Sequence, residues 1–503
     1  MKVCIVGAGI SGLTSAKILR ELGHDVVVFE KGSDIGGVWG ASKRYPGLAT
    51  QNTKDTYCLS DMPMPKSYPE WPAGVQVQAY LEAYAGKHNL HEAIHLDCEV
   101  IEMKRPAGSK RGWLIKTGDG NETKADHVVI CNGIFSDGAI PDYDGTADFK
   151  AKGGKVLHTS QIGDLDQVKG KAVIVVGYGK SACDLAHAVS EPGGASQTTV
   201  VARRLIWKLP RRIRGLGYKW LLLTRFGEAL FEYINPSSFI ERFLHHNRVG
   251  RGMRNAIVGA LGYVVKGQLR LETLGLLPEG AFDTIARSTI SLSTEGFYDK
   301  VARKQIDVRK DVRITRVGTS DKSDKQQQQL GATLSDGSFV PGDIIACGTG
   351  FRQQTPAFLP EKDQATLIDE KSHWLLYRHI KPLYVEDLTF NGYNSSLFCP
   401  TSSESAALWI GAYLSKGDAM LPKLEEQVRA TKEKLAWLDK RSMGKHASGT
   451  NLVPFSLHSI DDTLNDIGLN IGPFARLKQW LLPVDPTAYR HLPSRLKSKL
   501  SQA

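Results

Sequence analysis

Two glycine-rich turns, each between a buried strand and a helix, constrain the fold of this chain more than any other feature. Residues 2–6 form a short apolar run, the turn G-A-G-I-S-G follows at 7–12, and residues 13–22 have helical periodicity. The same arrangement recurs at residues 171–185. A near-continuous apolar strand that leads into a helix is typical of a parallel sheet covered on both faces. The sequence therefore predicts an α/β fold with two Rossmann-like domains.

The first turn fits the dinucleotide-binding pattern G-x-G-x-x-G. Gly7 permits the tight turn, Gly9 lets a pyrophosphate approach the backbone, and Gly12 lets the helix pack closely on the strand. The helix N-terminus then offers free N–H groups and partial positive charge to the phosphates. A second strand, residues 25–30, ends in Glu30, whose carboxylate can accept hydrogen bonds from ribose hydroxyls. Together these features predict a dinucleotide site.

The tetrapeptide Gly36-Gly37-Val38-Trp39 favours FAD in this first site. It supplies a flexible turn and then a large aromatic side chain suited to lining a flavin. A core tryptophan that happens to follow a turn is the alternative interpretation.

The second turn, G-Y-G-K-S-A at residues 177–182, differs from the first in its last residue and in the residues that end the following strand. Ala182 takes the place of the third glycine, which the pattern permits. The strand that follows, residues 198–202, ends in Arg203 and Arg204 instead of an acid. Arginine pairs with the 2′-phosphate of NADP, so the sequence favours NADPH over NADH. The alternative is that both arginines only belong to a basic surface.

Two dinucleotide sites in one chain imply electron transfer from a nicotinamide to a flavin. The residues that we expect to bind the two cofactors are Gly7, Gly9, Ser11, Gly12, Glu30, Lys31, Gly37, Val38, Trp39, Val100, Gly177, Tyr178, Gly179, Lys180, Ser181, Arg203, Arg204, Thr349 and Gly350.

Length and composition fit an ordinary reduced, cytoplasmic protein. The 503 residues are too many for one core. The seven cysteines form no C-x-x-C and no metal-type pairing with histidine, so no metal site is expected. The first strand begins at residue 2, which predicts no signal peptide, and the longest apolar stretches are well short of a membrane span.

Repeated patterns along the chain suggest its domain organisation. Residues 113–133 and 332–350 each resemble a small antiparallel meander that returns into a buried strand ending in glycine. The expected domains are an FAD-binding domain in 1–160 and 341–430, an NADPH-binding domain in 161–215 and 286–340, a helical insertion in 216–285, and a C-terminal tail in 431–503.

The positive charge is concentrated before and within the insertion. Residues 203–254 contain twelve Lys or Arg against three Glu. A solvated basic face, a phosphate site and peripheral contact with an acidic membrane surface all remain open. No nucleic-acid motif accompanies the charge, so nucleic acid is not expected as a partner. Aromatic residues in 216–277 either pack the insertion's own core or cap a substrate entrance, and a homodimer is also compatible with the sequence.

With both turns, Gly-Gly-Val-Trp and Cys-Gly-Thr-Gly-Phe at 347–351, the chain resembles the flavin-containing monooxygenases over residues 2 to about 425. Segments 60–69, 377–378 and 404–409 add to the resemblance. It implies that NADPH reduces FAD, that dioxygen then forms a C4a-hydroperoxyflavin, and that a nitrogen or sulfur atom of a small organic substrate is oxygenated. The protein mainly positions the reactants and excludes water.

Three departures from the family pattern affect the site residues. The resemblance implies an asparagine near the flavin, and the spacing offers Gln51 or Asn52 for this catalytic amide. In the family signature around His158, Lys152 and Ile162 replace two aromatic residues. Residues 44–47, R-Y-P-G, are more similar to the Baeyer–Villiger monooxygenases, although Gln51 stands where those enzymes have an aspartate.

Four functions are therefore weighed. An N- or S-oxygenating monooxygenase fits best, and a Baeyer–Villiger monooxygenase acting on a ketone comes second. A flavin reductase acting without oxygenation is third, although a thiol-active one would need a redox-active cysteine pair that the sequence lacks. A non-catalytic FAD-binding interaction protein is last, because both nucleotide turns are intact.

Overall fold

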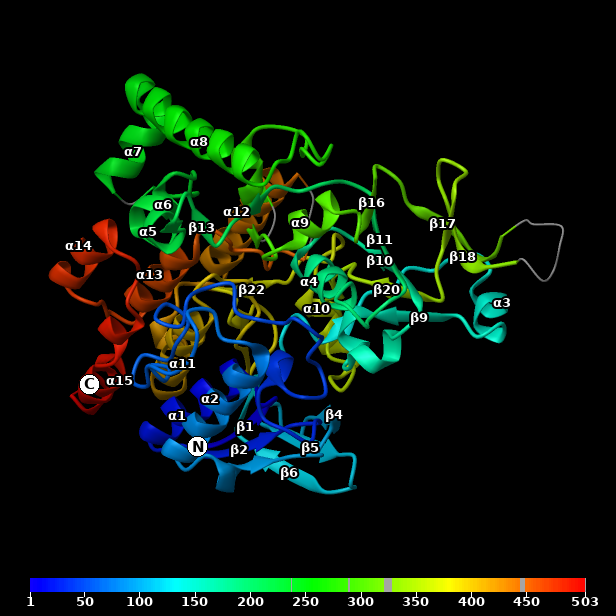
Figure 1. Ribbon diagram of the computed structural model, residues 1–503. Helices are drawn as coiled ribbons and strands as arrows, with labels where there is room; N and C mark the ends of the chain where they lie inside the picture. The colour runs from blue at the N-terminus through cyan, green and yellow to red at the C-terminus, as the bar shows by residue number, and fades with distance from the viewer. Residues whose placement is uncertain (237, 288–289, 321–327, 444–447, 503) are drawn as a thin grey trace.

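The computed structural model describes residues 1–236, 238–287, 290–320, 328–443 and 448–502. Figure 1 shows the N-terminal sheet at the bottom, the second sheet at the upper right and the C-terminal helices at the left. No helix in these described residues is long and apolar enough to cross a membrane.

The first sheet has five parallel strands around the N-terminus. Its order is β24 (Leu388–Phe390), β7 (His127–Ile130), β1 (Lys2–Val6), β2 (Asp25–Phe29) and β3 (Ile94–His95). β1 and β7 are almost completely buried, as the continuous apolar runs predicted. The strand β24 comes from a segment more than 250 residues away in the chain, so the first domain is closed by its C-terminal part.

The second sheet repeats the order of the first. β16 (Asp307–Lys310), β11 (Gln197–Ala202), β10 (Ala172–Val176), β20 (Ile344–Cys347) and β9 (Lys155–His158) are neighbours in this sequence and all pair in parallel. β10 and β11 occupy the places of β1 and β2. The expected α/β fold with two Rossmann-like domains is confirmed.

Two of these strands lie across the expected domain boundaries. β9 falls within 1–160 and β20 within 341–430, yet both belong to the second sheet. The physical reason is that both strands satisfy their backbone groups within the second sheet, where β20 pairs with β10 on one side and with β9, the edge strand, on the other.

Each sheet is accompanied by the antiparallel meander that the sequence suggested. Both meanders connect into a central strand of their own domain, β7 or β20. Their strands are β4 (Val100–Lys104), β5 (Trp113–Thr117) and β6 (Glu122–Ala125) in the first, and β17 (Ile314–Thr319), β18 (Leu330–Leu334) and β19 (Phe339–Pro341) in the second.

The insertion leaves and re-enters the second domain at neighbouring points. β12 (Lys208–Leu209) pairs in parallel with β15 (Ser291–Leu292), and the excursion lies between them. It begins with a short hairpin and continues as helices, as expected. These elements are β13 (Arg212–Ile213), β14 (Leu216–Gly217), α5 (Lys219–Leu222), α6 (Arg225–Ala229), α7 (Phe239–His246) and α8 (Arg248–Gln268).

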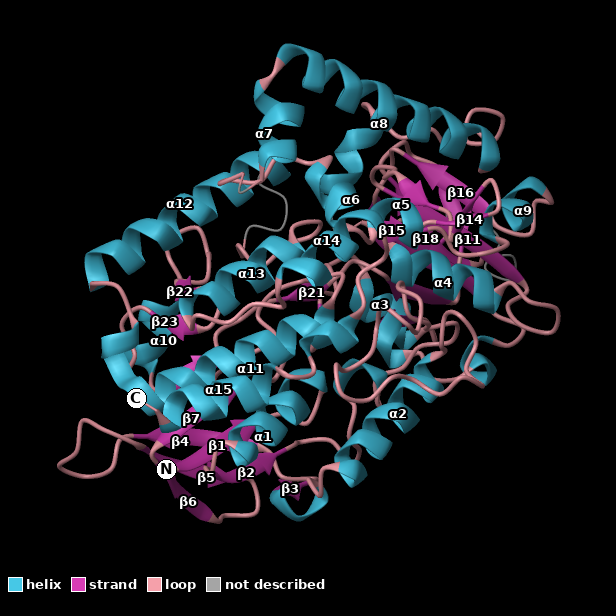
Figure 2. Ribbon diagram, turned by 90° about the vertical axis from the view of Figure 1, so that its left-hand side faces the viewer, coloured by secondary structure: helices cyan, strands magenta, loops and turns pink. Residues whose placement is uncertain are grey.

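The C-terminal region is a set of helices that packs on the first domain. α11 (Cys399–Lys416) is buried along most of its length and contacts α1 (Ile10–Glu21), α13 (Ser456–Asp466) and α15 (Leu492–Ser501). Figure 2 shows α11, α13 and α15 layered above the first sheet. The expected boundary at residue 430 falls inside α12 (Leu424–Ser442), so the segment after 430 continues this helical layer.

Candidate active site

The first glycine turn has the geometry that a dinucleotide needs. Gly7 has a φ of +107°, and a Cβ at Gly12 would lie 1.9 Å from the Gly7 carbonyl oxygen. A Cβ at Gly9 would meet nothing closer than Gly37 Cα at 3.6 Å, so the space over the turn is open to a ligand. The helix α1 starts at N-cap Gly9 with no side-chain cap, which leaves its first N–H groups for phosphate. This open cradle fits FAD.

Glu30 is bound to the turn through one carboxylate oxygen and to the loop after β2 through the other. The Ala8 N–H donates to Oε2 at 2.7 Å and the Gly32 N–H donates to Oε1 at 2.8 Å. Its neighbour Lys31 is exposed. Glu30 thus lies beside the phosphate cradle, where the proposed ribose contact requires it.

The Gly-Gly-Val-Trp segment packs against one side of the same turn. Gly37 has a φ of +60°, and a Cβ there would lie 3.2 Å from Gly9 Cα. Trp39 is buried edge-on against Tyr57, with ring centroids 5.8 Å apart, whereas Val38 is 40% exposed. Val100 is buried under the ends of the first sheet, in the same apolar cluster as Phe29.

The second turn repeats this construction. Gly177 has a φ of +114°, and Gly179 is the uncapped N-cap of α4 (Lys180–Val189), with nothing near a hypothetical Cβ. Ser181 is half-buried at the start of α4. Arg203 and Arg204 are both exposed directly after β11, the strand that follows this turn and its helix.

Two of the expected contact residues in this turn already have protein partners. The Tyr178 ring is buried, and its hydroxyl donates to the Tyr298 hydroxyl at 3.1 Å. Lys180 forms an ion pair with Asp184. Tyr178 therefore packs beneath the turn, and its backbone remains available to a nucleotide.

Thr349 and Gly350 lie in the loop after β20. The Thr349 hydroxyl donates to the Ala139 carbonyl, and the Ala139 N–H donates to the Gly350 carbonyl at 2.9 Å. His158 is buried and places Nε2 3.0 Å from the same Gly350 carbonyl oxygen. The burial lowers the pKa of His158, which favours its neutral form. These contacts connect the loop after β20 to residue 139 and to His158, in the segments through which the chain passes between the two domains.

Gln51 and Asn52 lie at the junction of the two domains and the insertion. Gln51 Oε1 accepts a hydrogen bond from the Leu292 N–H at 3.2 Å. Asn52 Nδ2 donates to the Leu397 carbonyl at 2.6 Å. The Tyr218 hydroxyl contacts the Gln51 carbonyl at 2.8 Å and Asn52 Oδ1 at 3.3 Å. The two side chains thus point to different neighbours, Gln51 to the second domain and Asn52 to the first.

A polar joint that the sequence analysis missed connects the R-Y-P-G segment to the second domain. The Tyr45 hydroxyl donates to Asp184 Oδ2 at 3.3 Å, and the Thr294 hydroxyl donates to Asp184 Oδ1 at 2.5 Å. Gly47 packs against the Asp184 backbone. The position of Asp184 four residues after Lys180 is a helical spacing that indicated a pair, but nothing in the sequence indicated Tyr45.

Lys208 is a second residue that the sequence did not single out. It is 1% exposed, with Nζ 3.2 Å from the Ser291 hydroxyl and 4.9 Å from the centre of the Tyr178 ring. Burial lowers its pKa.

Across the described ranges, with 237, 288–289, 321–327, 444–447 and 503 outside them, no group of His, Cys, Asp and Glu could hold a metal ion.

Comparison with known proteins decides the family. The profile of the flavin-binding monooxygenase-like family matches residues 1–258, half of the chain. The chain belongs to this family. Membership makes it an FAD-dependent monooxygenase.

Relatives of this flavin-binding monooxygenase-like chain span animals and plants. Flavin-containing monooxygenase 3 of Macaca mulatta is 32% identical over 49% of this chain and 50% of its own length. The human enzyme of that name is 26% identical over 86% of this chain and 77% of its own.

Among solved structures, cyclohexanone monooxygenase with bound ε-caprolactone has a TM-score of 0.68 at 18% identity, covering 92% of this chain and 96% of that one. S-allyl-L-cysteine S-oxygenase from Allium sativum has a TM-score of 0.61 at 17% identity, covering 100% and 99%. At these identities the likeness shows the shared fold.

Proposed function

We propose that this chain is an NADPH-dependent monooxygenase that adds one oxygen atom to a nitrogen or sulfur atom of a small organic substrate. The observation that carries the proposal is the pair of neutral amides, Gln51 and Asn52, at the junction of the two nucleotide domains. The Baeyer–Villiger enzymes that this chain resembles have an aspartate at the position of residue 51. Here that residue is Gln51, whose side-chain oxygen accepts a hydrogen bond from the Leu292 N–H. A relative from Cavia porcellus, 30% identical over 51% of the chain, is named an N-oxide-forming dimethylaniline monooxygenase.

The expected site residues have two roles: some bind the cofactors, and Asn52 orients groups at the domain junction. The open turns at Gly9 and Gly179 hold the two pyrophosphates against uncapped helix N-termini. Arg203 and Arg204 pair with the 2′-phosphate, which selects NADPH. Activation of dioxygen is the chemistry that FAD supplies when bound. Asn52 orients groups at the junction by donating and accepting hydrogen bonds.

The test is product analysis with the FAD-loaded protein, NADPH and air. Tertiary amines and thioethers are offered beside cyclohexanone, and mass spectrometry looks for one added oxygen atom. We expect N-oxides or sulfoxides, with NADPH consumed in proportion. A lactone as the main product would establish the Baeyer–Villiger alternative. Peroxide equal to the NADPH consumed, with every substrate, would indicate the reductase.

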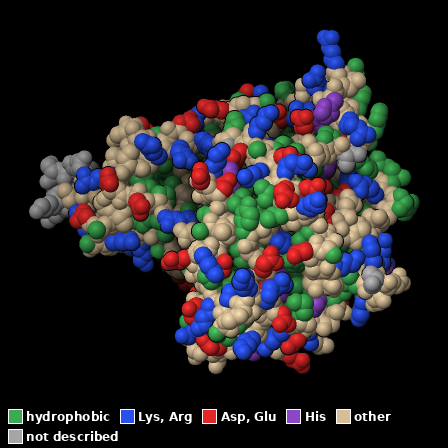
Figure 3. Space-filling view, turned by 180° about the vertical axis from the view of Figure 1, so that it is seen from behind, with side chains coloured by type: hydrophobic (Ala, Val, Ile, Leu, Met, Phe, Trp, Pro, Cys, Tyr) green, Lys and Arg blue, Asp and Glu red, His purple; other side chains and the backbone are tan. Residues whose placement is uncertain are grey.

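We also propose that one edge of the molecule contacts an acidic membrane surface. Phe239 at the start of α7 is 76% exposed, and Phe474 and Leu481 of α14 (Pro473–Leu481) are 79% and 75% exposed. α14 packs on α6 beside α7, where Arg242 and Arg248 are exposed. Figure 3 shows hydrophobic and basic side chains mixed along its right-hand edge, the edge of these helices. Such a surface fits lipid tails and anionic headgroups.

Sedimentation with vesicles tests this contact. We expect binding to vesicles that contain phosphatidylserine and weaker binding when Phe239 and Phe474 are both replaced by serine. Equal recovery with and without vesicles would exclude the contact.

A further inference from the structure

The amide NH₂ of Asn52 is oriented by one backbone carbonyl, and its oxygen by the Tyr218 hydroxyl. Its side chain is 2% exposed and donates to the Leu397 carbonyl oxygen at 2.6 Å, the shorter of its two contacts. Leu397 lies just before α11, in the loop that follows β24. A displacement of this loop would therefore rotate or release the Asn52 amide.

The same loop is attached to the start of α13. The Leu397 N–H donates to the Ser456 hydroxyl at 3.0 Å. Ser456 is completely buried and is the first residue of α13. Residue 397 is thus held through its carbonyl by Asn52 and through its N–H by Ser456.

α13 begins on a carboxylate from the insertion. The N–H groups of Leu457 and His458 donate to the two oxygens of Glu228, at 3.0 and 2.9 Å. Glu228 is 3% exposed and belongs to α6. A carboxylate that receives free N–H groups at a helix N-terminus is favoured by the helix dipole as well as by the hydrogen bonds.

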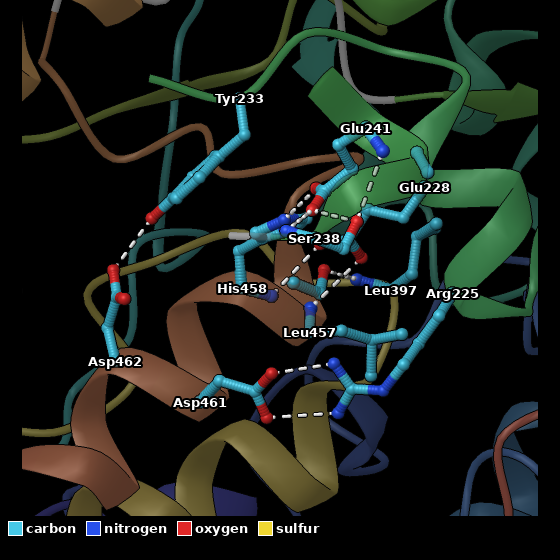
Figure 4. Close-up of polar contacts among 12 residues, drawn as sticks. Arg225, Glu228, Tyr233, Ser238, Glu241, Leu397, Leu457, His458, Asp461 and Asp462 are labelled. Carbon is cyan, nitrogen blue, oxygen red and sulfur yellow. Dashed lines mark hydrogen bonds and ion pairs between the residues drawn. The ribbon is translucent and has the colours of Figure 1, made fainter. Parts of the chain in front are cut away.

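The His458 ring joins the insertion at a second point. Its Nδ1 lies 2.5 Å from Glu228 Oε1, and its Nε2 contacts Glu241 of α7 (Figure 4). Burial opposes the charged ring, but the hydrogen bonds to both carboxylates outweigh it and raise the pKa of His458 to about 9. The cationic ring donates on both sides, so it holds α6, α7 and α13 together.

Other charged groups surround this clamp of Glu228, His458 and Glu241. Arg225 of α6 forms a two-pronged ion pair with Asp461 of α13, at 2.6 and 2.9 Å. The Tyr233 ring lies 4.2 Å from the His458 ring, and its hydroxyl donates to Asp462. Lys434 of α12 contacts Tyr233, and burial lowers its pKa to about 7.

We propose that Glu228, His458 and Ser456 are positioning residues for Asn52. Through them, the packing of the insertion on α13 sets the Leu397 carbonyl and with it the direction of the Asn52 amide. The route from Asn52 to the Glu228–His458–Glu241 clamp consists of hydrogen bonds of 2.5 to 3.0 Å and one turn of helix. The inference rests on the proposed role of Asn52, and it adds that the C-terminal helices take part in the site.

The chain offers a matched control for this clamp. His373 is also buried and also lies between two carboxylates, with Nδ1 2.9 Å from Asp369 Oδ2 and Nε2 3.1 Å from Asp439 Oδ1. Its backbone N–H and both ring nitrogens are bound to Asp369 and Asp439, which lie outside the route. Replacing it disturbs a similar buried cluster without changing the support of Leu397.

The experiment compares Ser456→Ala, His458→Gln and His373→Gln as FAD-loaded proteins. Hydrogen exchange of a peptide that contains Leu397 reports on the loop, and the flavin absorbance change on adding NADP⁺ reports on the junction. We expect about tenfold faster exchange and about tenfold weaker NADP⁺ binding in the first two variants only, the factor that loss of one hydrogen bond of about 1.4 kcal/mol produces. His373→Gln is expected to lower thermal stability alone.

A pH series adds a readout that a merely structural role would not give. Between pH 8 and 10, the exchange rate at Leu397 relative to the base-catalysed rate of the unfolded peptide is expected to rise in the wild type as His458 loses its proton, and this ratio is expected to stay constant in His458→Gln. Burial lowers the pKa of Lys434 to about 7, below this range. Equal exchange at Leu397 in His458→Gln and His373→Gln would overturn the positioning role. Failure of the wild type to oxygenate any substrate would remove the proposed function, and the exchange comparison would still stand or fall by itself.

Discussion

Replacing Gly12 with alanine is the sharpest test of how this chain builds its flavin site. A Cβ at residue 12 would lie 1.9 Å from the Gly7 carbonyl oxygen and 2.9 Å from its carbon. Ordinary contact begins near 3.4 Å, so α1 would have to move away from the turn by about 1.5 Å. Both contacts are backbone atoms, which leaves no flexible side chain to absorb the overlap.

The displacement of α1 sets the expected loss in the free energy of unfolding. Overpacking of a closely packed site costs about 1–3 kcal/mol, and about 2 kcal/mol corresponds to a fall of roughly 4–8 °C in the unfolding midpoint of a domain this size. The moved helix would also withdraw its N–H groups from the phosphates, so FAD should be lost on gel filtration. The ratio of flavin to protein absorbance and a thermal melt measure the two effects.

Two matched variants separate packing from ligand contact. Gly9→Ala places its Cβ at an ordinary 3.6 Å from Gly37 Cα, so it should melt like the wild type and still lose FAD. Ala182→Gly shortens the equivalent residue of the second turn and should keep FAD, at a cost of about 1 kcal/mol in helix stability. A Gly12→Ala protein with full flavin content and an unchanged midpoint would refute the reasoning.

Three further outcomes are expected. Arg203→Ala should raise the KM for NADPH about 10- to 100-fold and leave that for NADH unchanged in steady-state assays, because only the 2′-phosphate loses a charge-assisted partner. Glu30→Gln should weaken FAD binding about 10- to 100-fold in equilibrium dialysis, since an amide NH₂ would face the N–H of Ala8 or Gly32. The raised pKa of His458 contributes stability that is complete below pH 6.5 and is lost as pH passes about 9, up to about 3 kcal/mol. Urea midpoints should therefore fall between pH 6.5 and 9.5 in the wild type, and a His458→Gln protein with the same fall would contradict this.

The nucleotide sites could be predicted because their determinants are local. Gly7, Gly9 and Gly12 occupy one strand–turn–helix unit, and the same unit at 177–182 was recognisable by its spacing. That repeat predicted two Rossmann-like domains, and the structure adds that their sheets have the same strand order. Sequence reasoning also placed a candidate amide at residue 51 or 52, both of which the structure locates at the domain junction.

The contacts around that amide could not be predicted, because they join distant segments. The hydrogen bond from His458 to Glu228 connects residues 230 positions apart, and that from Asn52 to Leu397 spans 345 positions. No periodicity or motif marks such partners. The assignment of β9 and β20 to the second sheet was missed for the same reason, since β20 pairs with strands that lie about 170 or more residues earlier in the chain.

The parallel pairing of β12 with β15 gives the insertion neighbouring points of exit and return. A segment attached in this way behaves as a cassette, because its length and shape can change while the ends stay in place and the nucleotide-binding scaffold keeps its geometry. Grafting another insertion between these strands would then need companion changes where the present one is bound to the rest of the chain, among them the start of α13, where Glu228 and Glu241 meet His458, and the contact of Tyr218 with residues 51 and 52. Where substrate specificity diverges among such chains, we expect paired substitutions in the insertion and in the C-terminal helices that contact it.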